Sequence, residues 1–141
     1  MKFIKATLED FDIVKNIVHT TIRTIYPHYY PMGVIDFFLN HHSDSNIRRG
    51  IETETVLLME VEGVIVGTGS VHDNEIGRMF VLPGFQGLGY GTSLMKELED
   101  IIAKEYSKIL LHSSLPAYSL YIKLGYITIK YEKIIFRKEN E

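Results

Sequence analysis

Residues 77–93 have the sequence GRMFVLPGFQGLGYGTS, which predicts a strand, a glycine-rich loop and the start of a helix in direct succession. The apolar run ends at Pro83, which has no N–H to donate to a sheet ladder. Four glycines then fall within eight residues, and apolar residues at helical spacing follow Thr92. Each glycine costs roughly 0.5–1 kcal/mol relative to alanine where the chain is ordered, so this loop must need bare backbone. Such a loop before a helix N-terminus suits an anion such as a phosphate.

The composition is that of a folded globular protein. The chain has 141 residues, of which 45% are hydrophobic and 23% charged, and we expect one domain spanning residues 1–141. A formal net charge of -3 with mixed signs argues against a nucleic-acid partner and favours small molecules or proteins. There is no cysteine, which excludes disulfides, a thiolate nucleophile and a cysteine zinc site, and which suits a reducing cytoplasm.

The N-terminal residues MKFIK are too short and too charged for a signal peptide, and no apolar run approaches the ~20 residues of a membrane span. We therefore expect a cytoplasmic protein without a membrane partner.

The rest of the chain alternates strand and helix patterns. Thr7 and Asp10 have capping-box spacing, and the helix that they begin carries an apolar stripe as far as Ile25. Glu62-Gly63 is a hairpin turn signal, and residues 41–44 are expected to be loop or cap residues. Further helices are predicted at 34–40, from the glycine loop to about 104, and at 116–124; strands are predicted at 2–6, 55–61, 64–71, 75–81, 108–112, 126–131 and 134–137. The order β-α-α-β-β-β-α-β-α-β-β predicts an α/β fold in which helices cover a mixed sheet.

Three phosphate-binding patterns compete for the glycine loop. A P-loop requires a Lys-Ser/Thr pair after its second glycine, and this chain lacks that pair. A dinucleotide loop requires G-x-G-x-x-G, but Thr92 replaces the last glycine and the next strand ends without a carboxylate for a ribose. The third pattern, [RQ]-x-x-G-x-[GA], is matched by Gln86, Gly89 and Gly91.

With this third pattern the chain resembles the GNAT superfamily of N-acetyltransferases. A second segment, AYSLYIKLGY at residues 117–126, is similar to the superfamily signature A-x-x-[FL]-Y-x-x-x-G-[FY], and the predicted element order matches the GNAT fold throughout. The resemblance implies the GNAT acyl-CoA N-acyltransferase fold and acetyl-CoA as co-substrate. It implies transfer of the acetyl group to a primary amine by direct attack.

The resemblance also implies a cofactor site. Backbone N–H groups of the loop would hold the pyrophosphate of acetyl-CoA, and the end of the preceding strand would pair with pantetheine as a pseudo-strand. Ser114 falls where many relatives place an asparagine near the cofactor. From the residues alone, a plain tight turn before a helix is the alternative. The implied cofactor-binding residues are Met79, Phe80, Val81, Gln86, Gly87, Leu88, Gly89, Tyr90, Gly91, Thr92 and Ser114.

Two residues are candidates for catalysis. Tyr121 matches the tyrosine that protonates the departing thiolate in many GNAT enzymes, although its spacing alone indicates a core aromatic residue. Glu75 lies eleven residues before Gln86, where the histone-acetylating branch carries its general base; a solvated carboxylate at a strand end is the alternative. His72 is the other candidate base. Main-chain N–H groups near residues 79–81 would stabilise the oxyanion.

The amine acceptor is not identified by the sequence. GNAT enzymes usually form the acceptor pocket between their first two helices, where this chain has Tyr26, His28, Tyr29 and Tyr30. These side chains either flank an amine or pack on the sheet. The adjacent His41 and His42 make a poor metal site, and we expect no metal. The acceptor is a small-molecule or peptide amine, and the protein is a monomer or a homodimer that pairs through residues 126–137.

Two other functions compete with acetyl transfer. One is a catalytically silent acyl-CoA-binding sensor or regulatory module of the same fold. The other is a nucleotide-binding protein, which ranks third because the loop fits neither nucleotide pattern.

Overall fold

One mixed sheet forms the centre of the molecule. The structure, a computed structural model, describes residues 1–130 and 135–139, and within these ranges seven strands lie in the order β1-β2-β3-β4-β5-β7-β6. Neighbouring strands are antiparallel except β4 and β5, which are parallel. The strands are β1 (Lys2–Lys5), β2 (Thr55–Val61), β3 (Val64–His72), β4 (Glu75–Val81), β5 (Lys108–His112), β6 (Ile127–Lys130) and β7 (Ile135–Glu139).

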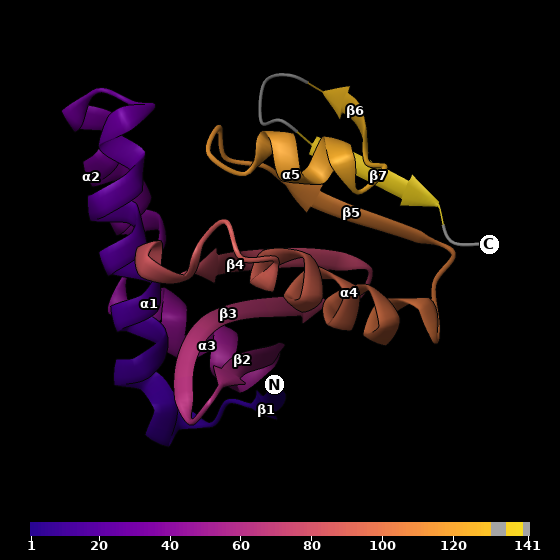
Figure 1. Cartoon of the computed structure of the whole chain (residues 1–141), viewed down its shortest axis with the longest axis horizontal. Helices are drawn as coiled ribbons and strands as arrows, with labels where there is room; N and C mark the ends of the chain where they lie inside the picture. Colours follow the sequence, from indigo (N-terminus) through magenta and orange to yellow (C-terminus); the bar gives the residue numbers. More distant parts are fainter. Residues whose placement is uncertain (131–134, 140–141) are drawn as a thin grey trace.

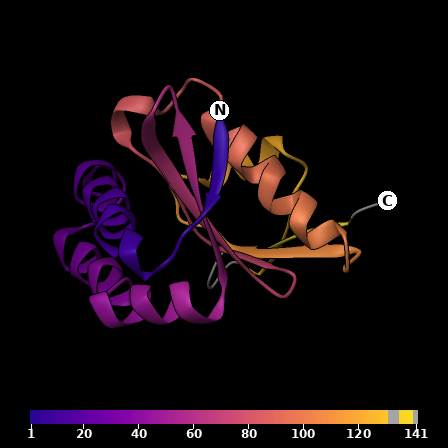
Figure 2. The same ribbon diagram turned by 90° about the horizontal axis from the view of Figure 1, so that it is seen from below.

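Helices cover both faces of the sheet (Figures 1 and 2). Three helices, α1 (Phe11–Ile25), α2 (Met32–His41) and α3 (Asp44–Thr53), lie on one face. Helix α4 (Tyr90–Ala103) lies on the other face, and the short α5 (Tyr118–Lys123) contributes Tyr121 to the same apolar cluster as α4. This arrangement confirms the predicted α/β fold with a mixed sheet.

Each face has its own apolar core. On the α4 face, Leu94 and Leu98 of α4 pack with Ile109 and Leu111 of β5. On the opposite face, residues of α1 and α3 pack with β2, and Phe80 of β4 joins this second core. Apolar residues of α4 recur three and four apart, which gives the helix a buried stripe as its sequence predicts.

Most predicted boundaries agree with the structure. The strands at 55–61, 75–81 and 108–112 are confirmed, and β3 is one residue longer than predicted. Glu62 and Gly63 both have positive φ, as a two-residue hairpin turn requires. The capping box of Thr7 and Asp10 is present, but it begins a 3-10 turn, Leu8–Asp10, so that α1 starts at Phe11. Of the strands predicted at 126–131 and 134–137, residues 131 and 134 lie outside the described residues.

The prediction of residues 41–44 as loop or cap residues holds for His42 and Ser43, which are caps, and is wrong at both ends, because α2 extends to His41 and α3 begins at Asp44. Ser43 is the N-cap of this helix and accepts a hydrogen bond from the N–H of Asn46 at 3.3 Å. Ile47 and Ile51, one turn apart, are buried against α1 and β2. The helix was missed because these two residues are the apolar content of an otherwise polar segment that contains Gly50. The element order therefore has a third helix before β2.

Strand β4 is distorted in the middle. Its register with β3 shifts opposite Thr68 and Ser70, so β4 has one extra residue, and Arg78 there has a φ of 47°. An extra residue changes which face the following side chains point to. As a result Arg78 and Phe80 both face α1, α2 and α3, whereas Met79 packs on the α4 side.

Strands β4 and β5 pair only briefly. Their parallel register consists of Glu75 with Leu110 and Ile76 with Leu111, and in the described part β4 has no partner on its β5 side after Ile76. The carboxyl end of β4 therefore offers unpaired backbone N–H and C=O groups at the middle of the sheet.

Candidate functional site

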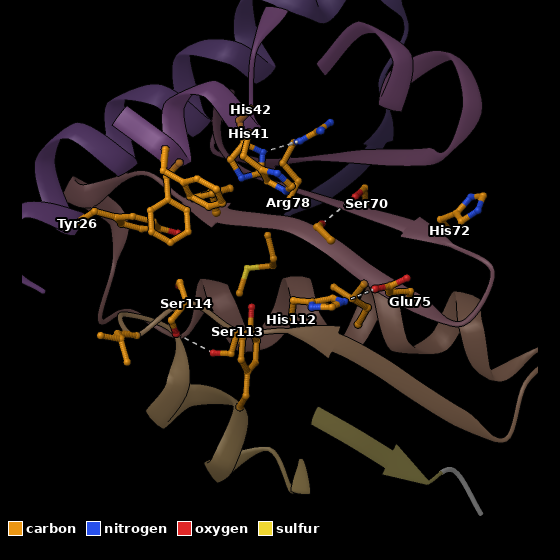
Figure 3. Close-up of a pocket in the computed structure, with 18 of the residues that line it drawn as sticks. Tyr26, His41, His42, Ser70, His72, Glu75, Arg78, His112, Ser113 and Ser114 are labelled. Carbon is orange, nitrogen blue, oxygen red and sulfur yellow. Dashed lines mark hydrogen bonds and ion pairs between the residues drawn. The ribbon is translucent and has the colours of Figure 1, made fainter. Parts of the chain in front are cut away.

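A cavity of about 870 Å³ opens where β4 and β5 separate (Figure 3). Its walls come from the 3-10 turn that follows α1 (Tyr26–His28) and from α2, from the adjoining parts of β3, β4 and β5, and from α5 and the loop before it. One part of the wall is aromatic, one part carries Glu75 and His112, and a third part carries His42 and Arg78.

Tyrosine and phenylalanine rings form the aromatic wall. Tyr26 meets Phe38 edge to face at 4.9 Å between ring centroids and stacks at 6.3 Å on Phe80. Burial raises the pKa of Tyr26 to about 12, an effect that a hydrogen bond with the Ser114 side chain partly offsets. The hydroxyl of Tyr30 accepts the N–H of Leu115 at 2.7 Å, which ties this wall to the loop before α5.

The structure brings only half of the predicted acceptor residues to the cavity. Tyr26 and Tyr30 line it, whereas His28 and Tyr29 are exposed and do not. Ser114, predicted to lie near the cofactor, lines the same cavity beside Tyr26.

A carboxylate and a histidine meet across the two parallel strands. Glu75 Oε1 lies 2.9 Å from His112 Nε2, and both side chains are about half exposed and line the cavity. His72 also lines the cavity, and its Nε2 lies 3.6 Å from Asp73 Oδ2. Sequence reasoning missed His112, although its place at the end of the strand after the glycine-loop helix is a usable signal, because ligand sites lie at the carboxyl ends of parallel strands.

Another histidine of the cavity wall, His42, is hydrogen-bonded to an arginine. Arg78 Nε donates to His42 Nδ1 at 3.0 Å, and His19 Nε2 donates to the His42 carbonyl at 2.7 Å. Burial first, and then the charge of Arg78, lower the pKa of His42 to about 3, so its ring is neutral at physiological pH. Sequence reasoning placed His41 and His42 in a loop without a function, yet both line the cavity.

Tyr121 is both a core residue and a cavity residue. It is buried on α5, its ring lies 5.9 Å from that of Tyr126, and it lines the cavity. Burial, with a smaller contribution from Tyr26, raises its pKa, so the hydroxyl is protonated at neutral pH. Tyr121 as a core aromatic residue and Tyr121 as a proton donor in the cavity are therefore compatible interpretations.

The glycine loop presents a row of free backbone donors. Within the described residues, the N–H groups of residues 87–92 make no hydrogen bond to other backbone or side-chain atoms. Gly87 and Gly89 have φ values of 77° and 87°, and a Cβ on either would meet nothing within 4 Å, so the loop is open on its outer side. Such a row at the N-terminus of α4 has the geometry and the polarity to bind an anion.

Other predicted cofactor residues hold the loop or line the cavity. The side-chain amide of Gln86 donates to the Val81 carbonyl at 2.8 Å and thereby fixes the loop to the end of β4. Met79 and Phe80 line the cavity, while Leu88 is exposed at the tip of the loop.

The described residues contain no group of three or more histidine, cysteine, aspartate or glutamate residues arranged to hold a metal ion. Among the helices of the same residues, none has the length and hydrophobicity to cross a bilayer.

Comparison with known proteins gives one family and many similar structures. The model of the acetyltransferase (GNAT) domain matches residues 25–136. No curated protein matches the chain.

Three solved structures illustrate the similarity. A GCN5-related N-acetyltransferase from Rhodopseudomonas palustris is 19% identical, with 98% of this chain and 94% of that chain covered and a TM-score of 0.86. The PaiA N-acetyltransferase from Thermoplasma acidophilum, in complex with coenzyme A, is 17% identical, with 98% of both chains covered and a TM-score of 0.81. The N-acetylglutamate synthase from Neisseria gonorrhoeae, complexed with coenzyme A and L-arginine, is 16% identical, with 99% of this chain and 33% of that chain covered and a TM-score of 0.72. At these identities the structures show a shared fold.

The pKa of His42 predicts how stability depends on pH. An unfolded histidine takes up a proton near pH 6.5, whereas folded His42 stays neutral down to about pH 3. The unfolded state therefore binds more protons below pH 6.5, and lowering the pH from 7.5 to 5.5 should reduce the free energy of unfolding by about 1.4 kcal/mol through this group. Urea unfolding at both pH values should show that H42Q loses this part of the pH dependence.

H28Q is the matched control, because His28 is exposed. An H42Q protein with the same pH dependence as the wild type would contradict the buried, neutral state of His42.

Proposed function

The chain belongs to the GNAT acetyltransferase family, and on that premise we propose that it transfers the acetyl group of acetyl-CoA to a primary amine by direct attack. It is an acyltransferase, and acetyl-CoA is its co-substrate. The observation that carries the proposal is the row of unpartnered N–H groups at residues 87–92, which directly follows the strand that borders the cavity.

The glycine loop fits the pyrophosphate of the co-substrate. Hydrogen bonds to a charged group contribute about 1.5–3 kcal/mol each, so a few of the N–H groups offset the conformational cost of the glycines. A neighbour of the same fold, PaiA from Thermoplasma acidophilum, was crystallised in complex with coenzyme A. In this proposal Gln86 acts by fixing the loop to Val81, because its amide already donates to that carbonyl.

The unpaired end of β4 would position the reacting group. Acetyl-CoA supplies a thioester carbonyl, which an amine attacks. Backbone groups of residues 79–81 that face the β5 side would pair with pantetheine and donate to a developing oxyanion, with the exception of the Val81 carbonyl, which already accepts from Gln86 and Thr21. Rigid N–H groups of this kind need no reorganisation when charge develops.

Glu75, together with His112, is the proposed proton acceptor. An amine must lose a proton to become acylated, and a carboxylate that lines the cavity can accept it, directly or through water. The contact of 2.9 Å between Glu75 Oε1 and His112 Nε2 holds the carboxylate at the point where β4 and β5 separate.

Tyr121 is the proposed acid. Its raised pKa keeps the hydroxyl protonated at neutral pH, and it lines the cavity from the β5 side of the opening. A protonated phenol can donate a hydrogen bond and then its proton to the sulfur as negative charge develops there. The thiol pKa of about 8.5 lies below that of the phenol, so complete transfer to a free thiolate is uphill, and the role of Tyr121 is to stabilise the developing charge.

The first prediction tests the loop. Alanine at Gly89 would have to adopt a φ of 87° and would place a Cβ on the open side of the loop. We expect G89A to weaken acetyl-CoA binding about tenfold or more, measured by titration calorimetry, and to reduce the thermal shift that acetyl-CoA produces in the wild type.

G84A is the control for this experiment, because Gly84 does not have positive φ and its Cβ would also meet nothing within 4 Å. Equal affinity of G89A and G84A would argue against pyrophosphate at this loop. A thermal shift with NAD or ATP, but none with acetyl-CoA, would favour a nucleotide-binding protein instead.

The second prediction tests turnover. Thiol release from acetyl-CoA should depend on an added primary amine, and Y121F should lower kcat about 100-fold because general acids contribute on the order of 10²–10⁴. The dissociation constant of acetyl-CoA should stay within about twofold, since the ring remains in the core.

Y118F is the matched variant on the same helix, at a residue that does not line the cavity. Unchanged turnover in Y121F would remove the acid role. A wild-type protein that binds acetyl-CoA but releases no thiol with any amine would be a sensor rather than an enzyme.

The third prediction tests the base. E75Q should lower kcat/KM about 100-fold for an alkylamine, which is protonated at the assay pH, and much less for a weakly basic amine that is already neutral. H112Q keeps an N–H that can donate to Glu75 and should lose little activity, whereas H112L should lose more. Equal loss of activity with both amines in E75Q would contradict proton transfer to Glu75.

A further inference from the structure

Arg78 is a partly buried cation that forms no ion pair within the described residues. Its guanidinium donates through Nε to His42 Nδ1 and through Nη2 to the Asn46 carbonyl, the latter at 3.4 Å. Nη1 is fully buried and has no hydrogen-bond partner in the described part of the chain. Glu54 is the carboxylate whose charge acts on this arginine, yet no ion pair joins them. A partly buried charge with one fully buried, unpartnered N–H group is costly unless another group compensates it.

Two local features that reduce stability accompany the placement of this guanidinium. Arg78 has a φ of 47°, in the left-handed region, at the extra residue of β4. Gly50 weakens the middle of α3, and a Cβ there would lie 2.5 Å from Nη1. The strained backbone of Arg78 and the glycine that leaves room for its guanidinium both concern one side chain beside the cavity. They point to a function for that side chain.

His42 connects the arginine to the cavity. An arginine N–H can only donate, so His42 Nδ1 is the acceptor and the single ring proton sits on Nε2. Nε2 makes no hydrogen bond to the protein within the described residues, and it is not among their fully buried unpartnered atoms. Because His42 is otherwise buried and lines the cavity, the cavity is where its Nε2–H is reached.

The cavity therefore has two electrostatic poles. Glu75 and His112 lie at one part of its wall and can hold an amine, while Arg78 and His42 lie at another part, as Figure 3 shows. At the second pole a neutral donor is backed by a cation, which suits an oxygen that carries negative charge. A simple alkylamine would leave this pole without a partner.

We propose that the amine acceptor also carries a carboxylate, as an amino acid does, and that His42 Nε2–H, polarised by Arg78, binds that carboxylate. This proposal rests on the proposed acetyl transfer and adds the class of acceptor. The aromatic wall of Tyr26, Tyr30 and Phe38 would contact the rest of the molecule.

The first test compares matched acceptors in the thiol-release assay. Phenylalanine, leucine and glutamate are each compared with the corresponding amide and the corresponding decarboxylated amine, and putrescine serves as a diamine. In at least one set, kcat/KM for the amino acid should exceed that for the amide and the amine about tenfold or more, as a hydrogen bond to a charged group predicts. Amides or amines that equal the amino acids in every set, or a preference for putrescine, would overturn the proposal.

The second test uses variants of the two residues. Glutamine at position 42 can accept from Arg78 and donate to the cavity, so H42Q should keep the preference for the amino acid over the amine within about threefold. H42L and R78M should each reduce that preference about tenfold. An unchanged preference in H42L would overturn the role of His42 even if R78M fails to fold.

R48M is the matched control for the loss of a positive charge. Arg48 lies on the same helix as Gly50, over the ring of Phe11, and does not line the cavity. If amines that lack a carboxylate release thiol as fast as the matched amino acids or faster, this inference is overturned and acetyl transfer is left intact. The absence of thiol release with every amine, despite binding of acetyl-CoA, would instead refute the proposed function.

Discussion

The short parallel pairing of β4 and β5 is the constraint on which the rest of the site depends. Two residue pairs join the strands, and beyond Ile76 the backbone of β4 has no neighbour on that side in the described chain. Unpaired backbone groups in the middle of a sheet need partners, from a ligand or from water. The opening between β4 and β5 also connects the two faces of the sheet. The glycine loop before α4 and the cavity beside α2 therefore both adjoin the end of β4.

The distortion in the middle of β4 determines which side chains of the strand face the cavity and which face α4. In a regular strand, residues 78 and 80 would share the face of Ile76 and pack toward α4. The extra residue at Arg78 changes the alternation, so that Phe80 joins the core under α1 and Val81, which a regular strand would place on that side, packs on the α4 side. The end of the strand is then fixed from both sides, because the Val81 carbonyl accepts from Gln86 of the loop and from Thr21 of α1. One strand thus positions both the glycine loop and the wall of the cavity.

Local patterns predicted most of the fold, and long-range contacts account for what they missed. Residues 55–61 and 64–71 are rich in β-branched residues and could be predicted as strands, and the glycine loop could be predicted from its spacing. Helix α3 depends on two buried isoleucines and a serine cap, which is a weak signal before the packing is known. The contact between Arg78 and His42 spans 36 positions, and no pattern within either segment indicates it. Likewise Glu75 could be singled out from its motif, but its contact with His112 depends on the parallel register.

The same burial that lowers the pKa of His42 also fixes the direction of its hydrogen bonds. A second proton on the ring would face the Nε–H of Arg78 and would add a charge beside an existing cation, so protonation is opposed by both desolvation and repulsion. The ring therefore remains an acceptor toward the arginine and a donor toward the cavity across the physiological pH range. An exposed histidine in the same place would alternate between tautomers and charge states, and its preference for a negatively charged oxygen would vary with pH. Burial of the pair thus gives the cavity a donor of constant polarity, at the expense of stability in acid.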